Sequence, residues 1–375
     1  ICEQIEDKEP GAYILLSKFF DDVVFEYAVT IMEDEFNLST LTINSSGLTS
    51  VDVTSNSALT RLNVSNCSSL TNLNCMRSTE STTFNSLDLT NCTALKNLDL
   101  YNCKGITTLD TTTLTALEVL NLTYSGVTTF NGVTNALDFS SNTSLRSIYL
   151  NGISTFGEID VSDNTLLEEL SLADNTNVNS LDFSNNVKLK VLNLSDVTAL
   201  TSLNVSGCTE LENFNVLNTG ITALSVTGSS NLTQFWVYNN TRLTNLSLTG
   251  ATSLTSVKLS AGSNNATLTS LTLSNNGITS LDVTYLTQLS TLDVSDCSAL
   301  ETITGMSTAI TNLNVTGCTA LTSLDLTGCT ALSTITGLDT CTSLNNLNVS
   351  ATDGLGIDLS MLSGSLTQYT AQNAT

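Results

Sequence analysis

The fold is decided by a stretch that the chain repeats, seen as Leu200-Thr-Ser-Leu-Asn-Val-Ser-Gly-Cys208, Leu289-Ser-Thr-Leu-Asp-Val-Ser-Asp-Cys297 and Leu321-Thr-Ser-Leu-Asp-Leu-Thr-Gly-Cys329. The shared pattern is apolar-x-x-Leu-x-apolar-x-x-Cys/Asn, and its first apolar residue is called the anchor below. Anchors follow one another at steps of 10 or 11 residues, apart from a few steps of 12 or 14. The anchors are Leu59, Leu70, Phe84, Leu95, Ile106, Leu117, Leu189, Leu200, Leu211, Ile221, Leu232, Leu243, Leu254, Leu268, Ile278, Leu289, Leu300, Ile310, Leu321, Leu332 and Leu344. Self-similarity at a fixed period is the signature of a repeat architecture.

The period predicts how the repeat folds. The Leu-x-apolar part alternates, so it indicates a short strand with one buried face. Two strands and two turns make one coil of 21 or 22 residues, which cannot bury its apolar side alone. Stacked coils bury a continuous column of Leu, Ile and Val. The sequence therefore predicts a mainly β solenoid of stacked coils with parallel strands.

The repeat carries a resemblance to a known family. Leu-x-x-Leu-x-Leu/Val-x-x-Asn/Cys resembles the leucine-rich repeat, and Thr319-Ala-Leu-Thr-Ser-Leu-Asp-Leu326 is similar to short repeats in surface proteins of Bacteroidota. The resemblance covers nearly all of residues 38–350 and implies a binding scaffold. It departs from the common helix-backed repeat, since both halves of the coil are predicted to be strands. Between Val127 and Leu145 the spacing fits either one or two half-coils.

The chain divides into an N-terminal segment, residues 1–36, and a solenoid, residues 37–375. The first 36 residues hold ten of the 35 acidic residues, together with an apolar stretch that charges interrupt. No uncharged run there reaches the roughly 18 residues of a membrane span. We expect a small folded cap over Gly11–Phe36, with a helix as its candidate structure.

The composition excludes several classes of function. The formal net charge is −24 and His is absent. Without His there is no Ser-His-Asp or Cys-His relay and no His-ligated metal. The acidic excess disfavours nucleic acid and anionic lipid as partners, and no phosphate-binding loop is present. We therefore expect a protein that is not an enzyme and has no cofactor.

Cysteines recur at one place in the pattern, three residues before the next anchor. That slot holds Cys67, Cys92, Cys103, Cys208, Cys297, Cys318, Cys329 and Cys341. Other coils place Asn there, as at Asn56, Asn175 and Asn186, which indicates a small group under the turn that meets the backbone. Cys297, Cys318 and Cys341 fall on the same edge of consecutive coils. We expect buried structural thiols, because a flat ladder rarely offers disulfide geometry.

Cys2 stands outside the repeat. An N-terminal Cys followed by an acidic cluster is similar to the mature start of surface-exported lipoproteins of Bacteroidota. Lipid attachment requires Cys at the first position, whereas Ile1 precedes it here. Cys2 is therefore a candidate lipid-attachment residue.

Outward strand residues sort into two faces. One face presents Asp182, Asn204, Ser225, Ser247, Thr272, Asp293, Asn314 and Thr336. The other presents Ser171, Asn193, Asn215, Trp236, Lys258, Asp282, Thr304, Asp325 and Asn348.

The second face contains the one Trp of the chain. Trp236 is flanked on its own strand by Gln234 and Tyr238, with Asn239 beyond, and we expect Lys258 one coil further on and Leu217 one coil back. An exposed Trp and Tyr beside polar donors suits a sugar ring or a protein hot spot. The alternative is a solvent-facing aromatic pair with no ligand, or one covered by the loop Ala261–Thr267. Tyr149 and Arg146 are candidates to extend this patch.

A column of acids offers a second hypothesis. Asp138, Asp160 and Asp182 recur 22 residues apart, which would stack three carboxylates. Repulsion at about 4.8 Å spacing would raise their pKa values or recruit a cation such as calcium. Because one flat column supplies too few oxygens for calcium, they are weak metal candidates, and a solvated acidic face is the simpler alternative.

These observations favour a non-enzymatic, cell-surface binding module that recognises protein or glycan through an outward strand face, either lipid-anchored at the outer membrane or secreted. The alternative is a structural or accessory subunit of a larger outer-membrane surface complex. Ice or mineral binding needs a regular Thr array, whereas these outward columns are mixed. A hydrolase finds little support.

Overall fold

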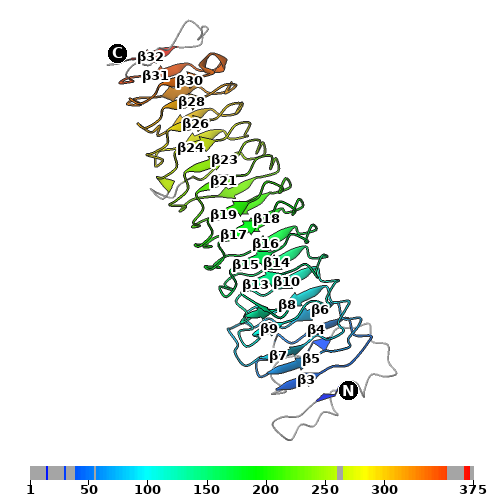
Figure 1. The fold of residues 1–375 in the computed structure, drawn as a ribbon. Coiled ribbons are helices and arrows are strands. Elements are labelled where there is room, and N and C mark those ends of the chain that lie inside the picture. Colours follow the sequence, from blue (N-terminus) through cyan, green and yellow to red (C-terminus); the bar gives the residue numbers. More distant parts are fainter. Residues whose placement is uncertain are drawn as a thin grey trace. The chain divides into compact units, whose positions relative to one another are not determined.

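The computed structural model describes residues 39–54, 56–259, 265–352 and 367–371, together with the backbone of 14–15 and 29–30. The chain forms two compact units, Ile1–Val178 (unit 1) and Asn179–Thr375 (unit 2). Both are solenoids of stacked parallel strands, with about 14 turns of about 22 residues in all. Figure 1 shows the strands following one another coil by coil. The predicted fold class is confirmed.

Unit 1 places its strands in two long sheets and two short ones. One long sheet has the order β1-β3-β5-β7, and β2-β4-β6-β8-β10-β14-β16 are consecutive neighbours in the other. The short sheets are β12-β11-β9 and β13-β15. The bounds are β1 Ile14–Leu15, β2 Val29–Thr30, β3 Thr40–Thr42, β4 Ser50–Asp52, β5 Arg61–Asn63, β6 Asn72–Asn74, β7 Ser86–Asp88, β8 Asn97–Asp99, β9 Thr108–Leu109, β10 Val119–Asn121, β11 Thr129–Phe130, β12 Val133–Thr134, β13 Ala136–Asp138, β14 Ser147–Tyr149, β15 Glu158–Asp160 and β16 Glu169–Ser171.

Unit 2 repeats the arrangement. Its neighbouring strands run β18-β20-β22, β17-β19, β21-β23-β24-β26-β28-β30 and β25-β27-β29-β31-β32. The bounds are β17 Ser180–Asp182, β18 Val191–Asn193, β19 Ser202–Asn204, β20 Asn213–Asn215, β21 Ala223–Ser225, β22 Gln234–Trp236, β23 Asn245–Ser247, β24 Ser270–Thr272, β25 Ser280–Asp282, β26 Thr291–Asp293, β27 Thr302–Thr304, β28 Asn312–Asn314, β29 Ser323–Asp325, β30 Thr334–Thr336, the 3-10 turn η4 Leu338–Thr340, β31 Asn346–Asn348 and β32 Gln368–Thr370. Among the described residues, no helix is long and apolar enough to cross a membrane.

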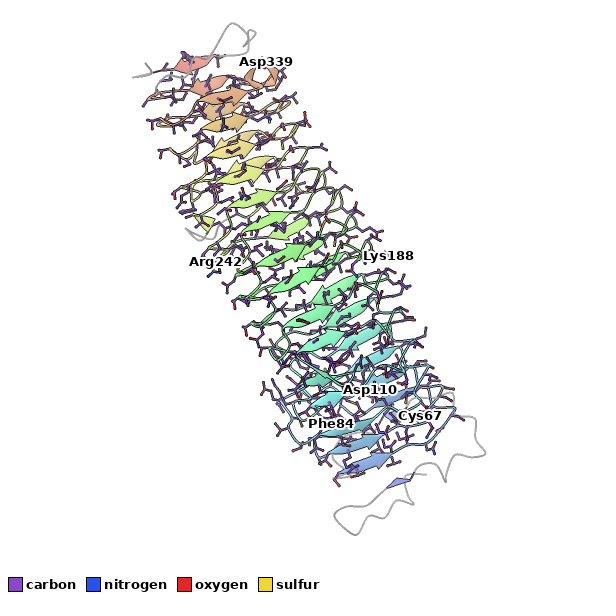
Figure 2. The ribbon with its side chains drawn as sticks, viewed as in Figure 1. Cys67, Phe84, Asp110, Lys188, Arg242 and Asp339 are labelled. Atoms are coloured by element: carbon purple, nitrogen blue, oxygen red, sulfur yellow. The ribbon has the colours of Figure 1, made fainter. Side chains whose placement is uncertain are left out.

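The core is the predicted column of apolar side chains. Every anchor named above is buried, with at most 2% of its surface exposed. The middle residue of most strands is buried as well, and it stacks on its counterpart, as Leu41 does on Leu62 and Leu292 on Leu313. Phe84 and Cys67, both labelled in Figure 2, are fully buried members of this column in unit 1. Burial of each such side chain contributes about 1.5–3 kcal/mol, so adding coils is what stabilises the fold.

The N-terminal segment joins the solenoid through two short strands. β1 pairs in parallel with β3, and β2 pairs in parallel with β4. A helix is therefore the wrong structure for Ile14–Leu15 and Val29–Thr30. The other residues of Gly11–Phe36, and Cys2, lie outside the described residues.

The stretch between Val127 and Leu145 departs from the plain coil. β11 pairs in parallel with β9 and antiparallel with β12, and β13 follows at once. Asn131 and Gly132 connect β11 to β12 with φ of 50° and 80°. Positive φ at both central residues is typical of a two-residue hairpin turn, for which Asn-Gly is the preferred pair. This small hairpin is why the spacing alone left the register open.

Asp and Asn at strand ends build the turns. Asp88 ends β7 and its Oδ1 accepts the N–H of Thr90 at 3.0 Å, and Asn314 does the same for Thr316 at 3.1 Å. This side-chain turn satisfies a backbone donor that has left the sheet. Much of the outward polarity of the strands therefore serves the coil.

Candidate functional site

The Trp236 patch, defined here as Leu217, Gln234, Trp236, Tyr238 and Lys258, lies within unit 2. Trp236 is paired in parallel with Asn215 of β20 on one side and with Lys258 on the other. The N–H of Asn218 donates to the carbonyl of Tyr238 at 3.3 Å, so Tyr238 lies beside the Leu217–Asn218 turn of the preceding coil. The predicted neighbours, Lys258 one coil on and Leu217 one coil back, are confirmed.

The patch is partly open to solvent. Phe235 is buried, and its neighbours on the strand face outward, with Gln234 exposed and Trp236 half-buried. Leu217 and Tyr238 are half-buried and Lys258 is exposed. No described residue forms an ion pair with Lys258. The surface thus combines apolar ring faces, an amide and an unneutralised ammonium, which are groups that can stack on and hydrogen-bond a ligand.

A buried Asn that sequence reasoning did not single out supports the patch. Asn240 is fully buried, and its Nδ2 donates to the carbonyls of Val216 at 2.8 Å and Val237 at 2.6 Å. Its Oδ1 accepts the backbone N–H of Thr219 at 2.8 Å. Asn240 occupies the slot that holds Cys in other coils, and this position was the available signal. It ties the turn after Trp236 to the coil before it.

Asn239 and the loop Ala261–Thr267 complete the predicted surroundings of the patch. Asn239 takes the turn position next to Asn240, with φ of 64°. The loop Ala261–Thr267, weighed as a cover for the patch, falls mainly within residues 260–264, outside the described residues.

Tyr149 and Arg146 lie in unit 1, where each has its own partner. The Tyr149 hydroxyl donates to Glu169 Oε2 at 2.7 Å, and Arg146 Nη1 lies 2.6 Å from Glu168 Oε1. Burial, followed by the Glu169 hydrogen bond, raises the pKa of Tyr149 to about 12. That they extend the Trp236 patch stays a prediction.

The acidic column is divided between the units. Asp138 and Asp160 are paired in β13 and β15 as predicted, whereas Asp182 of unit 2 is paired with Asn204. Asp182 Oδ1 accepts the N–H of Ser184 at 2.9 Å and an amide N–H of Asn204 at 3.0 Å. Its hydrogen bonds to Ser184 lower the pKa of this carboxyl, so the expected rise is wrong for Asp182. No cluster of three metal-ligating side chains occurs among the described residues.

The cysteines are structural, as predicted. The nine described cysteines are buried and unpaired. Seven of the nine thiols donate to a carbonyl of the preceding coil, as Cys297 does to Leu273 O at 3.0 Å and Cys318 to Val294 O at 3.1 Å. Burial raises the pKa of Cys318 to about 12, with added contributions from neighbouring Cys297 and Cys341. A thiol held neutral in this way is a poor nucleophile.

Sequence reasoning also missed a group of tyrosines in unit 1. Tyr101 and Tyr124 meet edge to face, with ring centroids 6.1 Å apart. Tyr124 occupies the turn position where most other coils carry Asn, Asp or Gly, with Ala351 as a second exception, and a bulky residue at this position was the signal in the sequence.

No protein-family model matches the chain, and no curated protein matches it either. Several solved structures are similar. The functional domain of InlJ from Listeria monocytogenes, described as including a cysteine ladder, is 27% identical over 88% of this chain and 66% of that chain, with a TM-score of 0.37. A leucine-rich repeat protein from Bacteroides ovatus is 14% identical over 93% of this chain and 84% of that chain, with a TM-score of 0.40. The leucine-rich repeat protein LIC12759 from Leptospira interrogans is 14% identical over 75% of this chain and 84% of that chain, with a TM-score of 0.36. Two of these three are named as members of the repeat class that the sequence resembles.

Proposed function

We propose that the chain is a non-enzymatic binding module of the leucine-rich-repeat type, which recognises a protein or a glycan through the outward strand face centred on Trp236. One observation carries the proposal: Trp236 lies half-exposed between Asn215 and Lys258, a lysine with no ion-pair partner among the described residues, with Tyr238 and Leu217 beside it. Elsewhere the outward strand positions hold mostly short polar residues that close turns. A large apolar side chain that the fold does not bury suits an interface.

The chemistry of the patch sets what it can hold. The indole and phenol faces would stack on a sugar ring or an apolar side chain, and Gln234 and Lys258 would donate hydrogen bonds. We propose that the module works at the cell surface or in the secreted fraction, and the repeat class and the acidic cluster that follows Cys2 support this. Outer-membrane attachment through Cys2 is part of this proposal.

The single Trp makes the test direct. Glycan and protein arrays would supply a ligand, and its titration would be followed by the fluorescence of Trp236. We expect a change in emission of the wild type. Because Trp236→Ala has no Trp, binding by the variants is measured by calorimetry, and we expect Trp236→Ala to lose roughly tenfold or more in affinity, as for an interface hot spot. Tyr369→Ala removes an exposed aromatic from β32 and is the control. A ligand whose affinity survives both substitutions would refute this site.

A second candidate function is that of an accessory subunit in an outer-membrane surface complex, in which the N-terminal segment or the last coil makes the contact. Affinity isolation from the native source in mild detergent, followed by mass spectrometry, separates the two. A stoichiometric membrane partner whose capture persists after Trp236→Ala supports the subunit role. Recovery of the protein alone supports an independent receptor.

A further inference from the structure

Tyr124 has an unusual backbone conformation for its residue type. Its φ is 54°, in the left-handed region that bulky side chains rarely adopt. At the same turn position other coils carry residues suited to it, among them Asn102, Asp174 and Gly152. Tyr124 nevertheless keeps the coil intact, since its N–H donates to Asn151 O at 2.8 Å. Asn would fill this position without strain. The strained Tyr124 therefore indicates that its ring has a functional role.

The ring lies along the outside of unit 1 across two coils. A Cβ atom at Gly152 would come within 2.3 Å of the Tyr124 ring, so the ring lies directly on that glycine. Its hydroxyl then reaches the following coil and donates to Asp174 Oδ2 at 3.1 Å. The absence of a side chain at Gly152 makes room for this arrangement.

A second tyrosine–carboxylate pair lies on the next coil, where the carbonyl of Tyr149 accepts the N–H of Leu122 at 2.8 Å. Tyr149 is three residues before Gly152, and its hydroxyl donates to Glu169 Oε2 at 2.7 Å. Tyr101 stands edge-on to Tyr124 at an interplanar angle of 74°, forming a corner of two rings. We call Tyr101, Tyr124, Tyr149, Glu169 and Asp174 the tyrosine edge.

The polarity of the tyrosine edge favours one kind of ligand group. The hydroxyl groups of Tyr124 and Tyr149 already donate their protons to carboxylates. The groups that remain available to a ligand are therefore hydrogen-bond acceptors and the faces of the rings. The ring of Tyr124 already attracts a cation, because Lys104 Nζ lies 5.9 Å from its centroid. Lys104 also forms an ion pair with Glu80 at 3.7 Å. Neither Asp174 nor Glu169 forms an ion pair with a described Lys or Arg.

We propose that the tyrosine edge docks a protein segment that presents arginine side chains. A planar guanidinium stacks on a Tyr face and donates to a carboxylate at the same time, which an ammonium does less well. The net charge of −24 supplies the long-range attraction. The surface is distinct in composition from the Trp236 patch and does not depend on the function proposed for it.

The test uses the whole chain and two labelled peptides, nona-arginine and nona-lysine, at physiological salt. We expect nona-arginine to bind roughly two- to fivefold more tightly than nona-lysine, the range of an exposed cation–π contact. Tyr124→Asn should abolish this preference while the melting temperature stays the same or rises, because Asn suits the left-handed turn. A Tyr with only a structural role would instead lower the melting temperature.

Pairs of variants with the same change in charge distinguish docking at the tyrosine edge from nonspecific electrostatic attraction to the whole chain. Asp174→Asn should weaken nona-arginine binding more than Asp163→Asn, which removes an exposed carboxylate elsewhere in unit 1. Lys104→Met should strengthen binding more than Lys188→Met, because Lys104 competes for the Tyr124 ring. Equal binding of the two peptides, or equal effects within each pair of variants, would overturn the proposal, as would no binding of either peptide.

Discussion

The thiol of Cys318 donates a hydrogen bond to the carbonyl oxygen of Val294, 3.1 Å away in the preceding coil. Cys341 makes the same contact with Val315 at 3.5 Å, so each thiol joins two coils through a backbone acceptor. Burial raises the pKa of both thiols, to about 12 for Cys318 and about 11 for Cys341. At neutral pH both thiols are neutral hydrogen-bond donors. This ladder of stacked cysteines therefore joins consecutive coils through hydrogen bonds and not through disulfides.

Native protein should therefore resist thiol reagents at these positions. With iodoacetamide at pH 8 we expect peptide mapping to find Cys297, Cys318 and Cys341 unmodified over hours, and modified within minutes in denaturant. The reason is that alkylation needs an accessible thiolate. Rapid native labelling of Cys318 would contradict the assignment of this ladder as structural.

Substitution of the buried Asn in the same slot should be far more costly than loss of the thiol. Asn240→Ala strands the carbonyl of Val216 and the N–H of Thr219, whereas the carbonyl of Val237 keeps its second donor, Asn265 Nδ2, at 3.0 Å. Each stranded group costs about 1–3 kcal/mol. We expect a loss of at least roughly 2 kcal/mol in the free energy of unfolding, read from urea midpoints.

The matched control is Cys318→Ser. Ser229 already fills an equivalent slot in unit 2, where its hydroxyl donates to Cys208 O at 3.0 Å. The Cys318→Ser loss should therefore stay near about 1 kcal/mol. If the two variants were equally stable, the backbone contacts of Asn240 would not be what holds this turn.

The repeat spacing made much of this structure predictable. Buried positions follow from the anchor period, and the register that brings Trp236 against Lys258 follows from counting whole coils. Spacing does not predict which hydrogen bonds or contacts an outward side chain makes. Asp182 lies 22 residues from Asp160, which indicated repulsion, yet its carboxylate closes a turn on Ser184. The sequence shows a bulky Tyr124 at a turn position, but the packing of its ring on Gly152 depends on the conformation of the turns, which spacing does not give.

The turn carboxylates should make stability depend on pH in the acid range. The hydrogen bonds from Thr284 lower the pKa of Asp282 below its ordinary value of 3.8, so the folded state favours the ionised form. This contribution is fully present above the ordinary pKa and is lost as the pH falls through the lowered one. Asp282→Asn keeps an oxygen that can accept the Thr284 N–H but cannot titrate. Urea midpoints between pH 5 and pH 2.5 should therefore fall less for Asp282→Asn than for wild type, and an identical fall would refute the effect.

The electrostatic surroundings of Trp236 can be measured without a ligand, by quenching of its fluorescence. Trp236 is the one Trp of the chain, and the ammonium of Lys258 belongs to the residue paired with it. Iodide, an anionic quencher, should reach the indole more readily than the net charge of −24 would suggest, because Lys258 attracts it locally. Lys258→Glu should lower quenching by iodide and raise quenching by caesium, whereas Lys188→Glu should change neither appreciably. The effect should fade at high salt, because screening limits it to about 10 Å at 0.1 M. Equal responses of the two variants would mean that the Lys258 side chain points away from the indole, and the Trp236 patch would then lose its one cation.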